Sequence, residues 1–281
     1  MQHRHEITFF ASGNAYDWLA PKYADRESNV RVYPLSGTLL HYRQGRFGLT
    51  KSIAKGIRFW SRVTKAVDQV SQLILRNKPD LVITDFEPIL PRAAERMGVP
   101  YLSIDHQHMS SACDLSELPL NLRAWAALMQ LAVGTHYQKQ RKTIVTAFTK
   151  IPIKTGVENA VSLGPIVRPE VASLRTAPEA GLLSYFRHPP TDAVLFALEQ
   201  CGLEVKVYGL GRHADRGKVR FLSHDDCDFT EDLARCQAFI GEASNEALGE
   251  AVYLRKPVLA LLNEKQPEQR INAFYLTRFG L

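Results

Sequence analysis

The sequence is poor in cysteine and has no long apolar run. Its 281 residues include 4 cysteines, at positions 113, 201, 227 and 236, and no two of them form a CxxC pair. This spacing predicts free thiols in a reducing compartment, with neither a disulfide framework nor a metal site. No apolar stretch approaches the ~20 residues that cross a bilayer, and the first residues are too badly flanked for a signal peptide. We therefore expect a cytoplasmic protein.

The composition is that of an ordinary globular protein, and its charge is uneven. Hydrophobic residues make up 45% and charged residues 23% of the chain, which excludes disorder and coiled coil. Residues 1–163 carry 21 Lys+Arg against 13 Asp+Glu, a balance of +8, whereas residues 164–281 carry 14 against 16, a balance of −2. The first part is therefore expected to face something anionic, such as phospholipid, a phosphorylated substrate or nucleic acid.

Apolar strand-like runs alternate with helix-length segments along the whole chain. This alternation predicts parallel sheets covered by helices, and the Pro- and Gly-containing stretch 163–170 predicts a linker. We expect an α/β protein of two Rossmann-like domains, 1–163 and 164–281, that face each other across a cleft. The predicted strands are 7–11, 81–84, 101–104, 182–186, 205–208, 238–240 and 257–261, and a helix over 88–97 is closed by Gly98.

Two longer helical segments have different patterns. The segment 51–75 is a basic amphipathic helix, which favours a surface helix docked through its apolar stripe. The alternative is contact with anionic lipid, through Lys51, Lys55, Arg58, Arg62 and Lys65. The segment 118–148 predicts one helix or a pair that belongs mostly to the core, including Trp125, Leu128, Met129 and Leu131, and the alternative is a lipid port.

The segment 241–251 contains small residues at a strand-to-helix turn. Such a turn lets a diphosphate approach the helix N-terminus, where free N–H groups and the helix dipole favour anions. Glu250 lies one and a half turns further on, where a carboxylate can accept hydrogen bonds from both ribose hydroxyls. Glu268 and Gln269, at the next helix start, could bind sugar hydroxyls. The alternative is an ordinary capped helix with a solvated glutamate.

Together these pieces resemble a family. The segment 241–250, the step 256–257 and the residues 268–269 and 272–273 resemble the donor-binding domain of GT-B glycosyltransferases. The similarity is to relatives of the UDP-GlcNAc transferase of peptidoglycan lipid-precursor synthesis, in a little-characterised bacterial and archaeal subgroup. The segments 5–13, 79–88 and 164–170 support it.

The resemblance implies roles for individual residues. Glu250 would bind the ribose, Ala243, Ser244 and Asn245 would lie near the diphosphate, and Glu268 and Gln269 would touch the donor sugar. The chain departs from the pattern because Ser244 replaces a usual glycine, and because Glu242 and Glu246 add carboxylates near the expected phosphates. The first strand with its Gly-rich loop and the last helices of relatives are missing from the pattern. We therefore expect a fragment or a short member.

The implied reaction is transfer of a sugar from a UDP-sugar to an acceptor hydroxyl, with a lipid-linked acceptor as one reading. Such enzymes generally work without a metal or other cofactor, and we expect none here. A general base would add roughly 10²–10⁴-fold. The candidates are Asp85, at the end of one strand, and His106, at the end of another beside Asp105, whose carboxylate would set the imidazole tautomer. His108 is a weaker candidate.

Other function classes stay open on the sequence. A nucleotide-sugar epimerase or hydrolase would form product without an acceptor, and a non-catalytic nucleotide-sugar or lipid-binding module would bind without turnover. Nucleic-acid binding is not expected, because the basic helix lacks interleaved aromatic residues. If the basic helix meets lipid, the protein would be peripheral on the inner face of the plasma membrane.

Overall fold

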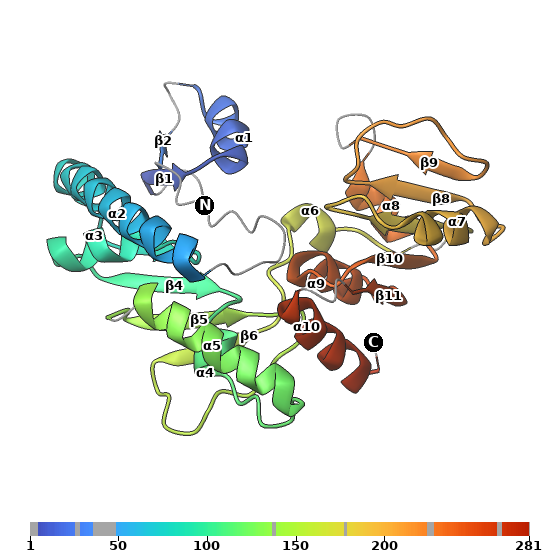
Figure 1. Ribbon diagram of the computed structural model, residues 1–281. Helices are drawn as coiled ribbons and strands as arrows, with labels where there is room; N and C mark the ends of the chain where they lie inside the picture. Colours follow the sequence, from blue (N-terminus) through green and yellow to red (C-terminus); the bar gives the residue numbers. More distant parts are fainter. Residues whose placement is uncertain are drawn as a thin grey trace. The chain divides into compact units, whose positions relative to one another are not determined.

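A computed structural model of the chain describes residues 5–25, 29–35, 49–136, 139–176, 179–223, 228–262 and 266–280 (Figure 1). The chain divides into two compact units. The first contains residues 1–101 with 136–140, and the second contains 102–135 with 141–281. Each unit is described by itself below. The domain boundary at 163/164 stays a prediction.

The first unit begins with a parallel strand pair. Strand β1 (Ile7–Ala11) is followed by helix α1 (Asn14–Lys22) and pairs with β2 (Val30–Pro34). Helix α2 (Leu49–Asn77), strand β3 (Val82–Thr84) and helix α3 (Ile89–Met97) follow. The predicted end of α3 is confirmed, because Gly98 closes it in the left-handed conformation with a φ of 69°.

Glu87 begins α3 by accepting hydrogen bonds from two backbone N–H groups. Its carboxylate lies 2.9 Å from the nitrogen of Ile89 and 2.7 Å from that of Leu90. Burial raises the pKa of Glu87, although these two bonds act in the opposite direction. The group therefore stabilises the helix start, a role that the sequence pattern did not reveal.

Helix α2 is the single amphipathic helix that the sequence predicts. It packs on α3, and in its described part it buries Val63, Ala66, Val70 and Ile74. Arg62 and Lys65 are exposed, which is the pattern of a docked surface helix. The side chains of Lys51, Lys55 and Arg58 lie outside the described residues. In the part of the chain that the structure describes, no helix is both long and apolar enough to cross a membrane.

The second unit contains a layer of parallel strands with its own helices. Strands β4 (Tyr101–Asp105), β5 (Lys142–Thr146) and β6 (Ala160–Leu163) pair in that order, with Ile104 opposite Ile144 and Ile144 opposite Val161. In the sequence, helices α4 (Met109–Ala112) and α5 (Leu120–His136) come between β4 and β5. The prediction of helix up to residue 148 is wrong, because β-branched residues from 143 to 146 favour a strand there.

The same unit contains a five-stranded parallel sheet with the order β11-β10-β7-β8-β9. Four of its strands were predicted, and β9 was missed. The parallel-sheet α/β fold class is confirmed. The strands are β7 (Leu182–Tyr185), β8 (Val205–Tyr208), β9 (Val219–Phe221), β10 (Ala238–Glu242) and β11 (Val258–Leu261), and the helices are α6 (Pro169–Ala172), α7 (Asp192–Gln200), α8 (Phe229–Arg235), α9 (Asn245–Tyr253) and α10 (Pro267–Arg278).

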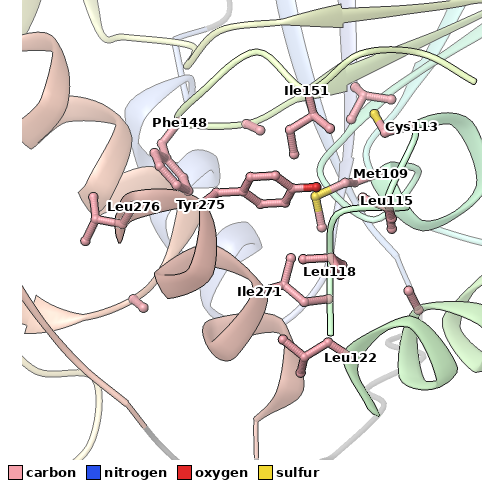
Figure 2. Packing of buried hydrophobic residues seen from close by; sticks show 14 of the residues in the cluster. Met109, Cys113, Leu115, Leu118, Leu122, Phe148, Ile151, Ile271, Tyr275 and Leu276 are labelled. Carbon is pink, nitrogen blue, oxygen red and sulfur yellow. The ribbon is translucent and has the colours of Figure 1, made fainter. Parts of the chain in front are cut away.

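Helix α10 is held by one apolar core. Figure 2 shows the ring of Tyr275 lying among side chains from α4, the loop after β5 and α10 itself, including Met109, Phe148 and Ile151. Burial raises the pKa of Tyr275 to about 12. This core fixes the amino end of α10, with Glu268 and Gln269, relative to the ends of β4 and β5.

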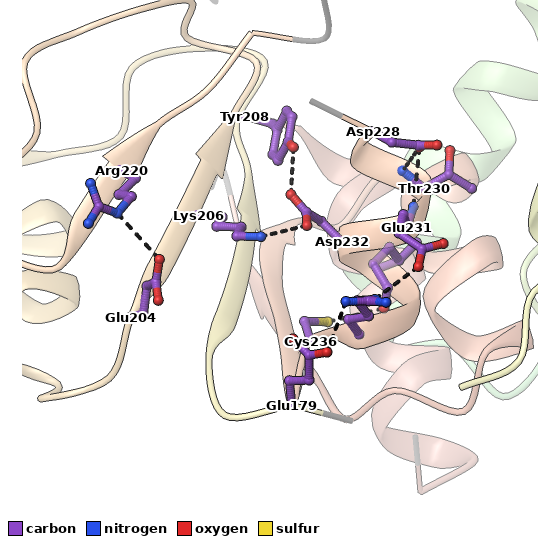
Figure 3. A network of polar contacts seen from close by, with 12 residues as sticks. Glu179, Glu204, Lys206, Tyr208, Arg220, Asp228, Thr230, Glu231, Asp232 and Cys236 are labelled. Carbon is purple, nitrogen blue, oxygen red and sulfur yellow. Dashed lines mark hydrogen bonds and ion pairs between the residues drawn. The ribbon is translucent and has the colours of Figure 1, made fainter. Parts of the chain in front are cut away.

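Polar contacts organise the outer part of the five-stranded sheet. Asp228 caps α8 through the backbone nitrogen of Thr230 at 2.8 Å, and Asp232 accepts from Lys206 at 2.6 Å and from the Tyr208 hydroxyl at 2.7 Å (Figure 3). The buried Lys256 ammonium donates to two carbonyls at the other end of α8. The ammonium of Lys256, which belongs to the step 256–257 of the family resemblance, is therefore already bound to backbone carbonyls of this unit.

Three of the four cysteines are free thiols, as the sequence predicts: Cys113, Cys201 and Cys236. Burial raises the pKa of both Cys113 and Cys236 to about 11. Because the thiolate is the reactive form, these two groups are inert near neutral pH. Cys227 lies outside the described residues.

Helix α5 differs from the core helix that the sequence predicts. Leu122, Ala126 and Val133 are buried, and Trp125 and Met129 are half-buried. Leu128 and Leu131, however, are 65% and 70% exposed. The prediction that these two residues belong to the core is wrong, because the helix has apolar residues on both faces and only one face meets the protein.

Gly249 lets α9 pack closely on the segment 164–168. A Cβ placed there would lie 2.7 Å from the Cβ of Pro165. We expect Gly249→Ala to lower the free energy of unfolding by about 1–3 kcal/mol, measured by urea denaturation. The matched control is Gly134→Ala in α5, where a Cβ meets nothing within 4 Å. That change should be neutral or stabilise by up to about 1 kcal/mol, and equal effects at both sites would contradict this packing.

Candidate functional site

Titratable side chains gather in the second unit where parallel strands end. His106 follows β4, His188 follows β7, and Glu242 is the last residue of β10. Glu268 and Gln269 lie in the first turn of α10. Ligands of open parallel sheets bind beyond the carboxyl ends of the strands, so this is where a site is expected.

His106 is buried with one ring nitrogen unsatisfied. Its side chain is 5% exposed, and Nδ1 lies 2.9 Å from the carbonyl oxygen of Thr146. A carbonyl only accepts, so Nδ1 carries the proton and Nε2 has the lone pair in the neutral ring. Nε2 has no hydrogen-bond partner among the described residues, and its nearest carboxylate oxygen is Oε1 of Glu268 at 3.8 Å. The geometry presents a basic nitrogen beside a carboxylate.

Asp105 is paired with His108 and does not orient His106. Its buried carboxylate accepts from the backbone nitrogen of His108 at 2.8 Å and from Nδ1 of that ring at 2.7 Å. The expectation that Asp105 sets the tautomer of His106 is therefore wrong. The chain turns into α4 after β4, which brings residue 108 back to the carboxylate, and the Thr146 carbonyl fixes the proton on His106.

Among the described residues, Glu242 contacts the side chains of Gln269 and His188. Nε2 of Gln269 donates to Oε2 of Glu242 at 3.3 Å, and Nδ1 of His188 lies 3.7 Å from Oε1. Because β7 and β10 are neighbours in the sheet, the residues that follow them meet. No local pattern in the sequence connects His188 with Glu242. Gln269 is buried, and Glu268 is partly exposed.

The turn before α9 contains the residues expected near a diphosphate. Ala243 is fully buried, and its carbonyl accepts from the Asn272 amide at 2.9 Å. Ser244 precedes the first residue of α9, and its side chain makes no capping hydrogen bond to the helix. Oδ1 of Asn245 accepts from the backbone nitrogen of Phe148 at 2.8 Å, so this side chain already has a structural contact. Glu246 is exposed.

Glu250, the expected ribose ligand, forms a bidentate ion pair with Arg168. Arg168 donates from Nε to Oε1 at 2.6 Å and from Nη2 to Oε2 at 2.8 Å. Glu250 is 8% exposed, and its hydrogen bond raises the pKa of Arg168. The pair and the Gly249–Pro165 contact together clamp α9 to the segment 164–168. Each carboxylate oxygen keeps a second lone pair, and the ribose role stays a prediction.

Asp85 is the other candidate base. It belongs to the first unit, where it is exposed after β3, so His106 is the candidate base within the second unit. The described residues contain no group of three or more His, Cys, Asp or Glu side chains arranged to hold a metal ion. A hollow of about 470 Å³ is lined mostly by residues of α10, both apolar (Ala273 and Phe274) and polar (Arg270, Thr277 and Arg278). None of the candidate residues lines it.

Comparison with known proteins finds a family model that matches the sequence and solved structures that share the fold. A family model described as "Glycosyl transferase family 1" matches residues 1–281. No curated protein matches the chain significantly. Among solved structures, the chain is similar to UGT89C1 of Arabidopsis thaliana complexed with UDP-L-rhamnose, at 12% identity and a TM-score of 0.61, over 98% of this chain and 76% of that one.

Two other solved structures are similar over nearly the whole chain. CalG4, the calicheamicin glycosyltransferase, shows 16% identity and a TM-score of 0.58 over 99% of this chain and 84% of that one. SsfS6 of Streptomyces sp. SF2575, complexed with thymidine diphosphate, shows 16% identity and a TM-score of 0.50 over 98% of this chain and 86% of that one. At these identities the likeness shows the fold, which is that of GT-B glycosyltransferases.

Proposed function

Since the chain belongs to glycosyl transferase family 1 and is a glycosyltransferase, we propose that it transfers a hexose from a UDP-sugar to an acceptor hydroxyl. Structures of the same fold contain UDP-L-rhamnose and thymidine diphosphate, which supports a nucleotide-sugar donor. We propose a donor similar to UDP-GlcNAc, because the sequence resembles relatives of the UDP-GlcNAc transferase. A lipid-linked acceptor also stays a prediction.

The arrangement of His106 and Glu268 carries this proposal. In the proposed reaction the acceptor hydroxyl donates to Nε2 of His106, and its proton passes to that nitrogen as the oxygen attacks the anomeric carbon. The bond from that carbon to the diphosphate oxygen breaks, and its electron pair leaves with the nucleotide. The Glu268 carboxylate, 3.8 Å from Nε2, would stabilise the imidazolium that forms.

The amino end of α9 is the proposed site for the diphosphate. Ser244 leaves the first N–H groups of the nine-residue helix without a side-chain cap, and such groups stabilise charge that develops on a leaving group. Glu242 is close to this turn, and its oxygens are near Gln269 and His188. The proposed mechanism uses no metal.

Glu250→Gln tests the donor site. Because a charged hydrogen-bond acceptor is worth about 1.5–3 kcal/mol, we expect the Kd for UDP, measured by calorimetry, to rise about tenfold or more. Arg168→Met is the matched control. It breaks the same ion pair but leaves the carboxylate, so it should lower the stability of the protein without weakening its affinity for UDP. If both variants lose stability equally while Glu250→Gln binds UDP like the unchanged protein, Glu250 is a clamp and not a ribose ligand.

A further inference from the structure

Helix α5 has two apolar faces, and the residues that the structure describes cover only one. Leu122, Ala126 and Val133 point into the core. The exposed residues Leu120, Ala124, Ala127, Leu128 and Leu131 follow the spacing i, i+4, i+7, i+8, i+11. This spacing places them together on the opposite side of the helix. Leu120 is 79% exposed, which makes the outward face a continuous apolar stripe.

Such a face requires a partner. A helix that is apolar all round is normally buried, and grouped apolar residues on a surface mark a contact with a protein or a membrane. The described part of α2 provides the contrast, because its apolar residues are buried and its exposed residues, such as Arg62 and Lys65, are charged. The lipid contact considered for α2 on sequence grounds is therefore better supported for α5.

The charge of the sequence segment that contains α5 indicates the kind of partner. Between Glu117 and Glu158 the sequence contains no acidic residue. Glu117 itself lies 3.5 Å from Arg278, so its charge is offset. A two-fold related copy would bring this basic segment close to itself, which like charges disfavour. In the second unit the exposed basic residues of this segment are Arg123, Arg141 and Lys150. The Lys154 ammonium instead donates to the carbonyls of Ser110 and Ser111.

We propose that the outward face of α5 rests on the surface of an anionic bilayer. The exposed leucines enter the interfacial region, and basic side chains such as Arg123 and Arg141 contact lipid phosphates. The helix has 17 residues, which suits an interfacial helix rather than a spanning one. This inference goes beyond the proposed function and does not depend on it.

Vesicle sedimentation of the full chain tests this surface. The probes are vesicles of equal parts phosphatidylglycerol and phosphatidylcholine, and vesicles of phosphatidylcholine alone. We expect binding to the anionic vesicles, with weaker binding as salt is raised. The double variant Leu128→Ser/Leu131→Ser should lower the partition coefficient by about tenfold or more, since each leucine loses the benefit of apolar burial.

A matched variant controls for general surface hydrophobicity. Phe196→Ser/Leu259→Ser removes two apolar side chains that are 61% and 57% exposed outside α5, and it should bind vesicles like the unchanged chain. Equal loss in both double variants, or equal binding to the two kinds of vesicle, would overturn the proposal. A second result would also overturn it: the unchanged chain does not bind vesicles but forms a dimer in sedimentation velocity, and the α5 variant does not form this dimer. Calorimetry with UDP on the α5 variant reports separately on the donor site.

Discussion

Replacing His106 by glutamine is expected to lower kcat by about 10²–10⁴-fold, with the Kd for UDP unchanged. Nε2 of His106 is the unpartnered nitrogen that would take the acceptor proton, and the glutamine amide cannot take it. In the parallel variant His106→Asn the amide nitrogen takes the place of Nδ1 and can still donate to the Thr146 carbonyl, so the same loss of kcat is expected there with the loop after β4 intact. Steady-state kinetics and calorimetry on the same preparation separate the loss of chemistry from a loss of binding.

The control for this variant is His213→Gln. His213 is exposed and contacts the carbonyl of Leu210 through Nε2, outside the gathered groups. It should keep the kcat of the unchanged chain. A His106→Gln enzyme that retained more than about a tenth of kcat would exclude His106 as the general base, because proton transfer by a positioned side chain contributes far more than that.

Removal of the Asp105 carboxylate is expected to cost the most stability. In Asp105→Ala, the backbone nitrogen and the ring Nδ1 of His108 both lose a fully buried acceptor. We expect a fall of about 3–5 kcal/mol in the free energy of unfolding, measured by urea denaturation, which is typical when one partner of a buried pair is removed.

Two variants bracket this effect. Asp105→Asn keeps an acceptor for one of the two bonds, so its cost should be smaller, about 1–3 kcal/mol. Asp215→Ala removes an exposed carboxylate that pairs with Arg220, and its effect should stay within about 1 kcal/mol. If Asp105→Ala were no worse than Asp215→Ala, the buried pair would contribute nothing to the fold.

The sequence predicted elements whose signals are local. Strand β10 and helix α9 were found because a short apolar run is followed by small residues and a helical pattern. Gly98 marked the end of α3 for a similar reason. Strand β5 was missed because its run 142–146 was absorbed into a longer apolar segment. Its β-branched residues were the available signal.

The ionic contacts of the site could not be predicted in the same way. Arg168 and Glu250 are 82 residues apart in the chain, and no local pattern connects them. Asp105 and His106 are adjacent, which suggested a pair, yet adjacent side chains diverge and the turn brings His108 to the carboxylate instead. The meeting of His106 with Glu268 also depends on the core around Tyr275, which no single segment encodes.

The short segment from Thr146 to Phe148 links two groups of the proposed mechanism. Its carbonyl at Thr146 holds the proton of His106, and its nitrogen at Phe148 is bound by Asn245, the first residue of α9. The proposed diphosphate site at the amino end of α9 and the orientation of the His106 ring therefore depend on the same three residues.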